Sequence, residues 1–166
     1  MIHELSGDIL FSGAKAVVQG VAPNDDFLHS LALQLRERMP ALYKDFRHFC
    51  KIQHPKSGGL WTWMSADGRL IVNLFTHDAA YGHGSKPGLA TLSHVNRTLH
   101  ALRDFVKKEK IASLALPRLA CGLTGLKWDE VKPLIEKHLG DLNIPVYLYV
   151  TYQKGVKASE PTERKK

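Results

Sequence analysis

The chain has 166 residues, of which 44% are hydrophobic and 23% are charged, a composition typical of one globular domain. It has no apolar run near the roughly 20 residues of a membrane helix, and its start, MIHELSGDILF, lacks the features of a signal peptide. We therefore expect a cytoplasmic monomer without a membrane partner. The formal net charge of +7 favours an anionic ligand or a nucleic acid, although solubility alone explains it equally well.

Strands and helices alternate along the chain, as the spacing of apolar residues indicates. The expected strands lie at residues 2–5, 16–21, 60–65, 70–75, 111–116 and 146–152. The expected helices lie at residues 27–39, 41–50, 89–109 and 128–139. Asp25 or Asp26 could cap the first helix, Pro40 opens the second, and Ala66-Asp67-Gly68 forms the turn between the two middle strands.

This order of elements predicts an α/β domain with three layers, α/β/α, in which helices cover both faces of a mixed sheet. Residues 1–152 form this domain, and residues 153–166, with the polar stretch KASEPTERKK, are expected to form a basic, disordered tail. Ligands of such sheets bind at the carboxyl ends of the strands. Two glycine-containing loops follow strands in this way, at residues 76–88 and 117–125.

The loop PRLACGLTG leads from a buried strand into a helix through small residues. Backbone N–H groups at a helix start, with few side chains in the way, can form a cradle for a phosphate. The residues that could supply it are Ala120, Cys121, Gly122, Leu123, Thr124 and Gly125. The pattern is neither a P-loop nor a GxGxxG motif, so a tight strand-to-helix turn is the alternative explanation.

The two cysteines, Cys50 and Cys121, are expected to be reduced, because a chain without an export signal seldom forms disulfides. The sequence has no CxxC pair and no HExxH motif, and Asp78 with His83 is only a weak cluster. We therefore expect no metal and no cofactor. Cys121 lies among backbone amides that would favour a thiolate, but a nucleophilic role for it has little other support.

The segment PRLACGLTGLKW resembles the signature P-x-[IL]-G-C-G-L-x-x-L-x-W of macrodomains, in the branch of terminal ADP-ribose protein glycohydrolase and the DNA ADP-ribosyl glycohydrolase antitoxins. The matching residues are Pro117, Leu119, Cys121, Gly122, Leu123, Leu126 and Trp128, and Ala120 replaces the first glycine. The opening Gly7-Asp8-Ile9-Leu10 and the closing VYLYVTY also resemble this family, so the resemblance covers about residues 1–152. The chain is also similar to small stand-alone bacterial macrodomain proteins.

The resemblance implies a mixed sheet of about six strands between helices, with an ADP-ribose cleft at the strand ends. It implies that Asp8 accepts a hydrogen bond from the adenine amino group and that Ile9 lines the adenine pocket, although Asp8 could also be only a turn residue. The segment 120–125 would hold the diphosphate and the distal ribose. Tyr149 or Tyr152 would stack near adenine, worth about 1–3 kcal/mol, or would contribute only to packing.

Other positions depart from the family pattern. Gln19 and Ala22 stand where the family has asparagines, and Gln19 is kept as a candidate ADP-ribose contact. Phe27-Leu28-His29-Ser30 replaces an M-G-x-G stretch, so this loop is not expected to form a second glycine cradle. Asp25 and Asp26 could meet ribose hydroxyls, but capping of the next helix is the favoured explanation.

His77 stands where the branch has a catalytic lysine, in the sequence Leu74-Phe75-Thr76-His77. Histidine cannot form the covalent adduct that lysine forms with the opened ribose, but it can act as a general acid or base. Asp78 could orient the imidazole, and Thr124 stands at the position of a catalytic aspartate. Lys86 lies in the same loop, where a lysine is most often solvated.

The sequence therefore leaves three hypotheses. The favoured one is a hydrolase that releases ADP-ribose from a nucleic acid or a protein, with His77, Asp78 and a bound water acting at the anomeric carbon. The second is a module that binds ADP-ribose without turnover, which the missing lysine and the altered loop favour. The third is a scaffold that has lost the ligand.

Overall fold

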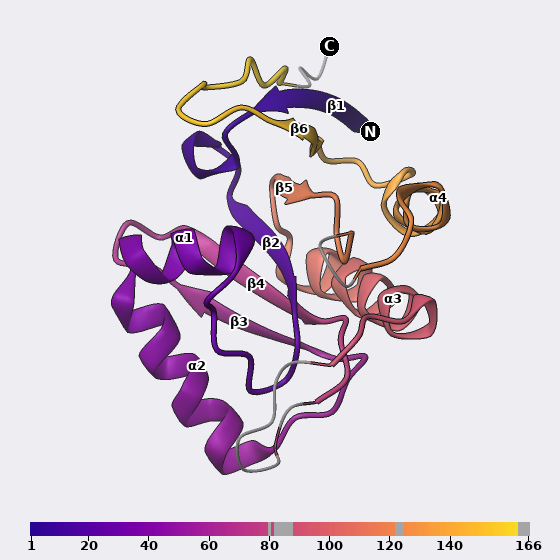
Figure 1. Ribbon diagram of the computed structural model, residues 1–166. Coiled ribbons are helices and arrows are strands. Elements are labelled where there is room, and N and C mark those ends of the chain that lie inside the picture. The colour runs from indigo at the N-terminus through magenta and orange to yellow at the C-terminus, as the bar shows by residue number, and fades with distance from the viewer. Residues whose placement is uncertain (80, 82–87, 122–124, 163–166) are drawn as a thin grey trace.

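The computed structural model describes residues 1–79, 81, 88–121 and 125–162 (Figure 1). Its strands are β1 (Ile2–Gly7), β2 (Ala16–Val21), β3 (Leu60–Met64), β4 (Leu70–Phe75), β5 (Leu114–Pro117) and β6 (Val146–Tyr152). Its helices are α1 (Ser30–Arg38), α2 (Pro40–Gln53), α3 (Leu92–Glu109) and α4 (Trp128–Leu139), with a 3₁₀ turn, η1 (Ile9–Phe11), after β1. The strands form a six-stranded sheet in the order β1-β6-β5-β2-β4-β3, which confirms the predicted fold class.

The sheet is mixed because β3 runs antiparallel to β4 at one edge, while its other strand pairs are parallel. Leu60 pairs with Leu74 and Met64 with Leu70, and Gly68 takes φ +86° in the turn between the two strands. The hairpin predicted for this region is confirmed. Because parallel strands end at the same edge of a sheet, the residues that follow β1, β2, β4, β5 and β6 come together there.

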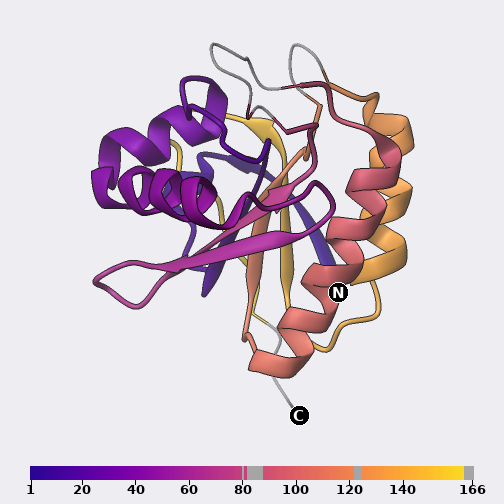
Figure 2. The same cartoon turned by 90° about the horizontal axis from the view of Figure 1, so that it is seen from below.

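Helices cover both faces of the sheet, as the three-layer prediction requires (Figure 2). In this view α1 and α2, in purple, lie on one face, and α3 and α4, in pink and orange, lie on the other. β4 lies between these layers and all six of its residues are buried, which explains its nearly continuous apolar sequence. Within the described ranges, none of the helices combines the length and apolar character needed to cross a membrane.

The first helix begins later than its apolar spacing predicted. α1 starts at Ser30 instead of Phe27, because Phe27 and Ser30 both take left-handed φ angles, +53° and +55°. His29 is the N-cap and makes no side-chain capping hydrogen bond. The expected capping of this helix by Asp25 or Asp26 is therefore wrong. The remaining boundaries lie within a few residues of the predicted ones.

Residues 153–162 pack against the domain, although the sequence led us to expect a disordered tail. Ala158 is buried, and the Glu160 carboxylate accepts hydrogen bonds from Ser12 Oγ at 2.6 Å and from Tyr149 Oη at 2.7 Å. Residues 153–162 thus contact the domain through Ala158 and Glu160. Their polar composition could not reveal this, because their partners lie far away in the sequence.

Candidate active site

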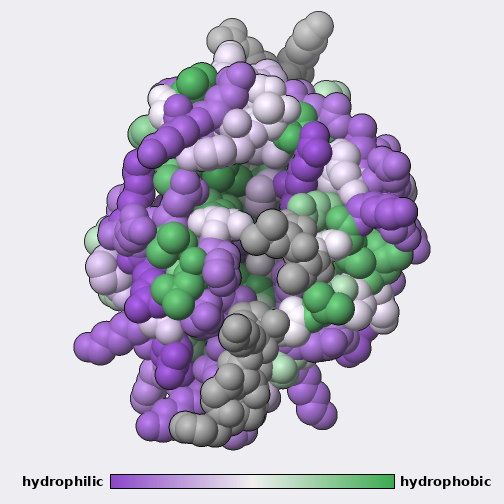
Figure 3. Space-filling model, viewed as in Figure 1, coloured by the Kyte–Doolittle hydropathy of each residue, from purple (hydrophilic) through white to green (hydrophobic). Residues whose placement is uncertain are grey.

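The carboxyl ends of the parallel strands place several predicted site residues along one edge of the sheet. Asp8 directly follows β1, His77 lies two residues after β4, and Ala120 lies three residues after β5. The loop after β2 carries Asp25 to the same edge. The space-filling view shows the face seen in Figure 1 hollowed near its centre (Figure 3). This edge is where α/β sheets bind their ligands.

Asp8 is buried, and both oxygens of its carboxylate accept backbone hydrogen bonds. Oδ1 accepts from Leu10 N and Oδ2 from Gly155 N, each at 3.0 Å. The bond from Leu10 gives Asp8 the turn role that the sequence left open. A ligand role remains compatible with it, because each carboxylate oxygen can accept a second hydrogen bond. Ile9, the next residue, is buried beside it.

The two candidate tyrosines of β6 have different surroundings. Tyr152 is exposed at the carboxyl end of β6, beside the end of β1, and its Oη accepts from Gln34 Nε2 at 2.9 Å. Tyr149 is buried and its Oη donates to Glu160 at 2.7 Å. Burial and this hydrogen bond raise the pKa of the Tyr149 phenol. Tyr152 is therefore the more accessible ring near Asp8.

Ala120 takes φ +59°, a left-handed conformation that glycine adopts without strain and alanine does not. This is the position at which the macrodomain signature has glycine. The Ala120 carbonyl accepts from Leu126 N at 2.6 Å, which closes the loop before α4. Three predicted cradle residues lie outside the described part of the chain: Gly122, Leu123 and Thr124. The cradle is therefore described only at its two ends.

Cys121 is half-buried in this loop, and burial raises the pKa of its thiol. The Arg118 charge acts in the opposite direction but with less effect. Burial thus favours the thiol and opposes the effect that neighbouring backbone amides would have. A nucleophilic Cys121 gains no support.

His77 is held between the ends of β2 and β4. Its Nδ1 lies 2.9 Å from Thr76 Oγ1, and Gly20 makes room for that threonine, since a Cβ on Gly20 would lie 2.7 Å from Thr76 Oγ1. Burial lowers the pKa of His77, and the charges of Asp25 and Asp78 partly oppose this effect. The imidazole is therefore neutral at pH 7, the state that a general base requires.

Asp25 is a site residue whose role sequence reasoning missed. Its Oδ2 accepts from Ala22 N at 3.1 Å and its Oδ1 from Phe27 N at 2.9 Å, so it holds the loop after β2 in its turn. Burial raises its pKa, against these two hydrogen bonds and the nearby charge of His77, which lower it. The loop after β2 thus brings a buried carboxylate near enough to His77 for their charges to interact. The available signal was an aspartate pair a few residues after a buried strand.

Asp78 was predicted to orient His77, but its side chain is hydrogen-bonded to His94, in the first turn of α3. Asp78 Oδ1 lies 2.9 Å from His94 Nε2. The His94 Nδ1 is buried and has no hydrogen-bond partner within the described ranges. Sequence reasoning missed His94, because it falls inside a regular amphipathic helix. Among all the residues that the structure describes, no three His, Cys, Asp or Glu side chains are grouped so that they could hold a metal ion.

Gln19 lies inside the sheet and is 2% exposed. Its Nε2 donates to Asn73 Oδ1 at 2.7 Å, and Asn73 Nδ2 donates to the Trp61 carbonyl at 3.3 Å. The Gln19 Oε1 is buried with no partner among the residues that the structure describes. The side chain is thus committed to a neighbouring strand, and its contact with ADP-ribose stays a prediction.

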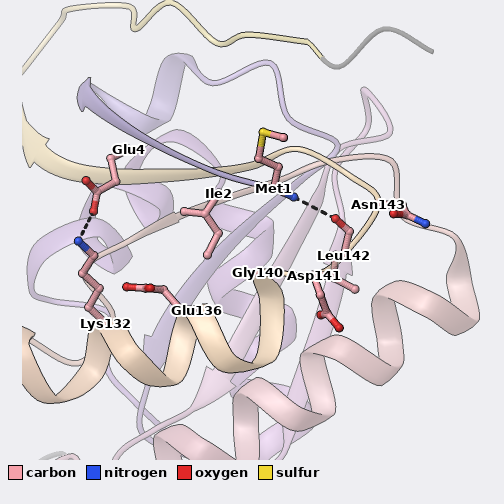
Figure 4. Close-up of a pocket in the computed structure, with 9 residues that line it drawn as sticks. All are labelled: Met1, Ile2, Glu4, Lys132, Glu136, Gly140, Asp141, Leu142 and Asn143. Carbon is pink, nitrogen blue, oxygen red and sulfur yellow. Dashed lines mark hydrogen bonds and ion pairs between the residues drawn. The ribbon is translucent and has the colours of Figure 1, made fainter. Parts of the chain in front are cut away.

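A separate recess lies between β1 and α4, at the opposite ends of the parallel strands (Figure 4). It has a volume of about 770 Å³. The Met1 ammonium donates to the Leu142 carbonyl at 2.9 Å, and Lys132 forms a 2.7 Å ion pair with Glu4. The Met1 ammonium and the Lys132–Glu4 pair are thus engaged within the recess, and its position is not the edge at which such sheets bind ligands.

Comparison with known proteins finds similar sequences, although no family model matches the chain. Over 164 residues, 92% of its length, the chain is 28% identical to the DNA ADP-ribosyl transferase-DNA ADP-ribosyl glycohydrolase fusion protein of Thermosipho africanus, of which it spans 42%. Over 97 residues, 57% of its length, it is 33% identical to human ADP-ribose glycohydrolase OARD1, of which it spans 59%. The chain thus spans about half the length of the curated relatives it matches.

A solved structure shows the same fold. The macrodomain of Thermus aquaticus DarG matches with a TM-score of 0.79 at 25% identity, over 90% of this chain and 98% of that one. The six-stranded sheet order and the signature at residues 117–128 agree with this similarity. The chain therefore has the macrodomain fold, and it is similar in sequence to a DNA ADP-ribosyl glycohydrolase fusion protein and to the ADP-ribose glycohydrolase OARD1.

Proposed function

We propose that the protein binds ADP-ribose along the sheet edge that carries Asp8, Ala120 and His77, and hydrolyses the bond that joins ADP-ribose to DNA. The observation that carries this proposal is the position of these three residues at the ends of β1, β5 and β4. The names of the similar proteins, a DNA ADP-ribosyl glycohydrolase fusion and an ADP-ribose glycohydrolase, support the same ligand. The reaction is proposed to occur in the cytoplasm.

The adenosine end is proposed to bind at Asp8. The exocyclic amine of adenine donates to a free lone pair of the Asp8 carboxylate, the buried Ile9 forms an apolar wall, and the exposed ring of Tyr152 stacks on the base. The diphosphate then follows the loop 120–125, where backbone N–H groups before α4 face the negative charge.

The N-terminus of α1 supports a second contact with the diphosphate. Ser30 takes a glycine-like φ of +55° although this loop has no glycine, and the N-cap residue His29 offers no side-chain acceptor to the first turn. The free N–H groups and the helix dipole of α1 favour an anion at this end. The sequence predicted no second glycine cradle in this loop, and the anion contact proposed here uses the start of α1 instead.

His77 is the general base in the proposed reaction. Its neutral imidazole takes a proton from water while the water oxygen bonds to the anomeric carbon of the distal ribose. The bond from that carbon to the DNA breaks, and the leaving group takes a proton from solvent. The products are free ADP-ribose and unmodified DNA, and His77 returns its proton to solvent.

Binding without turnover is the alternative, and one feature favours it: the position of the catalytic lysine is occupied by His77, which cannot form a covalent adduct. The two functions differ in one measurable respect, because only a hydrolase separates ADP-ribose from its carrier.

The test is the release of ADP-ribose from an ADP-ribosylated single-stranded oligonucleotide under single-turnover conditions. We expect release by the wild type, and a rate lower by about 100-fold or more in His77→Ala, with ADP-ribose binding retained. Asp8→Ala should weaken binding more than it slows the chemical step. If the wild type binds ADP-ribose but does not release it from the oligonucleotide, the alternative is established. If the wild type neither binds ADP-ribose nor releases it, the proposal is overturned.

A further inference from the structure

A groove lined with aromatic side chains lies between α2 and β3, outside the proposed ADP-ribose site. It has a volume of about 380 Å³, and its lining residues are Asp45, His48, Phe49, Ile52, Gln53, Trp61 and Trp63. The rings of Phe49 and Trp61 stack with their centroids 5.4 Å apart and their planes at 23°. Trp63 Nε1 donates to Asp45 Oδ2 at 2.8 Å. The aromatic rings are thus fixed in place before any partner binds.

A row of basic residues follows the rim of this groove on α2. Lys44, His48 and Lys51 are spaced i, i+4 and i+7, so they lie on one side of the helix, and all three are exposed. Between residues 40 and 56 the chain has four Lys or Arg residues and one acidic residue, Asp45. Because the basic residues outnumber Asp45, the rim presents a net positive charge beside the aromatic floor.

The groove leads toward the candidate active site. α2 ends at Gln53, and four residues later Ser57 Oγ donates to the His77 carbonyl at 2.8 Å. Tyr81 Oη, from the segment after His77, donates to the Pro55 carbonyl at 2.7 Å. The chain that leaves the groove end is thus bonded to His77 itself and to the segment that follows it. The end of the groove therefore lies next to the proposed general base.

We infer that this groove, with the basic row, binds single-stranded nucleic acid and holds nucleotides that flank the modified one. Phosphates would lie against Lys44, His48 and Lys51, and bases would stack on the rings of Trp61 and Trp63. The strand must be unpaired, because only then are its bases free to stack on side chains. The role in catalysis rests on the proposed function, but binding of an unmodified strand does not require ADP-ribose.

A protein is the competing occupant, since β3 lies at the edge of the sheet and could pair with another strand. A second copy of this chain would bring two rows of like charge together along that edge, which is unfavourable. A polyanion meets the same row with opposite charge. The charge of the rim therefore favours nucleic acid.

The first test measures fluorescence anisotropy of a labelled, unmodified single-stranded oligonucleotide of about 12 nucleotides. The Lys44→Gln/Lys51→Gln variant should bind about tenfold more weakly at low salt, and the slope of log K against log[salt] should fall by about 1.4. The matched control is Lys107→Gln/Lys108→Gln, which removes the same charge from exposed positions in the last turn of α3. An equal loss in the control, or no loss in either variant, would overturn the inference.

The second test separates stacking from charge. Trp63→Ala should weaken oligonucleotide binding by about tenfold, while Trp63→Phe should retain most of it, and duplex DNA should compete poorly. Calorimetry with free ADP-ribose should give the wild-type affinity for every variant. If the wild type binds the oligonucleotide but not ADP-ribose, the proposed function is wrong, while the inference that the groove binds single-stranded nucleic acid is retained. If Trp63→Ala leaves oligonucleotide binding intact and instead abolishes self-association, the surface is a protein interface and the inference is wrong.

Discussion

Gly155 donates its backbone N–H to the Asp8 carboxylate at 3.0 Å, although the two residues are 147 positions apart in the sequence. Asp8 N in turn donates to the Val156 carbonyl at 2.7 Å. A Cβ on Gly7 would lie 2.9 Å from that same carbonyl, so this approach requires glycine. The segment 153–162 therefore shapes the corner at which we propose that adenine binds.

Glu160 is the anchor of this segment, because its carboxylate accepts from Ser12 Oγ, Gly13 N and Tyr149 Oη. Glu160→Ala would leave the buried Tyr149 hydroxyl without its acceptor, and we expect the free energy of unfolding to fall by about 1–3 kcal/mol. Urea denaturation measures this. The exposed Glu37 of α1 provides the control, and Glu37→Ala should change stability by less than about 0.5 kcal/mol. Equal effects of the two changes would show that residues 153–162 do not stabilise the domain.

Ala120→Gly should stabilise the protein. At φ +59° the alanine is in a conformation that costs an L-residue about 1–2 kcal/mol, and the greater freedom of glycine in the unfolded chain offsets part of the gain. We expect an increase of about 0.5–1 kcal/mol in the free energy of unfolding, whereas Ala120→Val, which is β-branched, should lower it. Thermal unfolding of the three proteins decides this. A lower stability for the glycine variant would contradict the left-handed conformation of Ala120.

The buried His77 should make stability depend on pH. Because burial lowers its pKa below the ordinary value near 6.5, the folded state favours the neutral ring. The contribution of His77 to the free energy of unfolding is fully present above about pH 6.5 and is lost as the pH falls below that value. Unfolding free energies between about pH 7 and pH 5 should therefore fall more steeply for the wild type than for His77→Gln. Asp25, whose pKa is raised, titrates in the opposite sense, but it is present in both proteins. Parallel curves for the two proteins would show that burial does not lower the pKa of His77.

Gly88→Ala should displace Asp78. A Cβ at Gly88 would lie 2.6 Å from the Asp78 Cβ and 3.2 Å from its carbonyl oxygen, so the segment before α3 must shift. We expect a loss of about 1–3 kcal/mol in stability and a slower release of ADP-ribose. Gly59→Ala is the control, because the nearest atom to its added Cβ is the Lys56 carbonyl oxygen at 3.8 Å. If both variants behave like the wild type, the contact between Gly88 and Asp78 has no functional role.

The fold could be predicted from the sequence because its strands are short, apolar and regularly spaced. α4 and β6 have the predicted ends, Trp128–Leu139 and Val146–Tyr152. The start of α1 could not be predicted, because the φ angles of Phe27 and Ser30 depend on burial and on a loop that Asp25 holds from within. Periodicity records which side chains face the core and contains no information about such a loop.

The candidate site was predicted where it depends on chain position, and missed where it depends on contacts. Asp8, Ala120 and His77 follow strands, and parallel topology brings strand ends together. The charge interaction of Asp25 with His77, the bond of Asp78 to His94 and the bond of Gly155 to Asp8 join segments that are apart in the sequence, which a single sequence does not reveal.

The measurement that tests the central claim most directly is calorimetric titration of the protein with ADP-ribose, for the wild type and for Asp8→Ala. We expect saturable binding at one site per chain and a loss of about tenfold or more in affinity for the variant, in line with one charge-assisted hydrogen bond. No heat of binding with the wild type, or an unchanged affinity in Asp8→Ala, would contradict the claim that this edge of the sheet holds the nucleotide through Asp8.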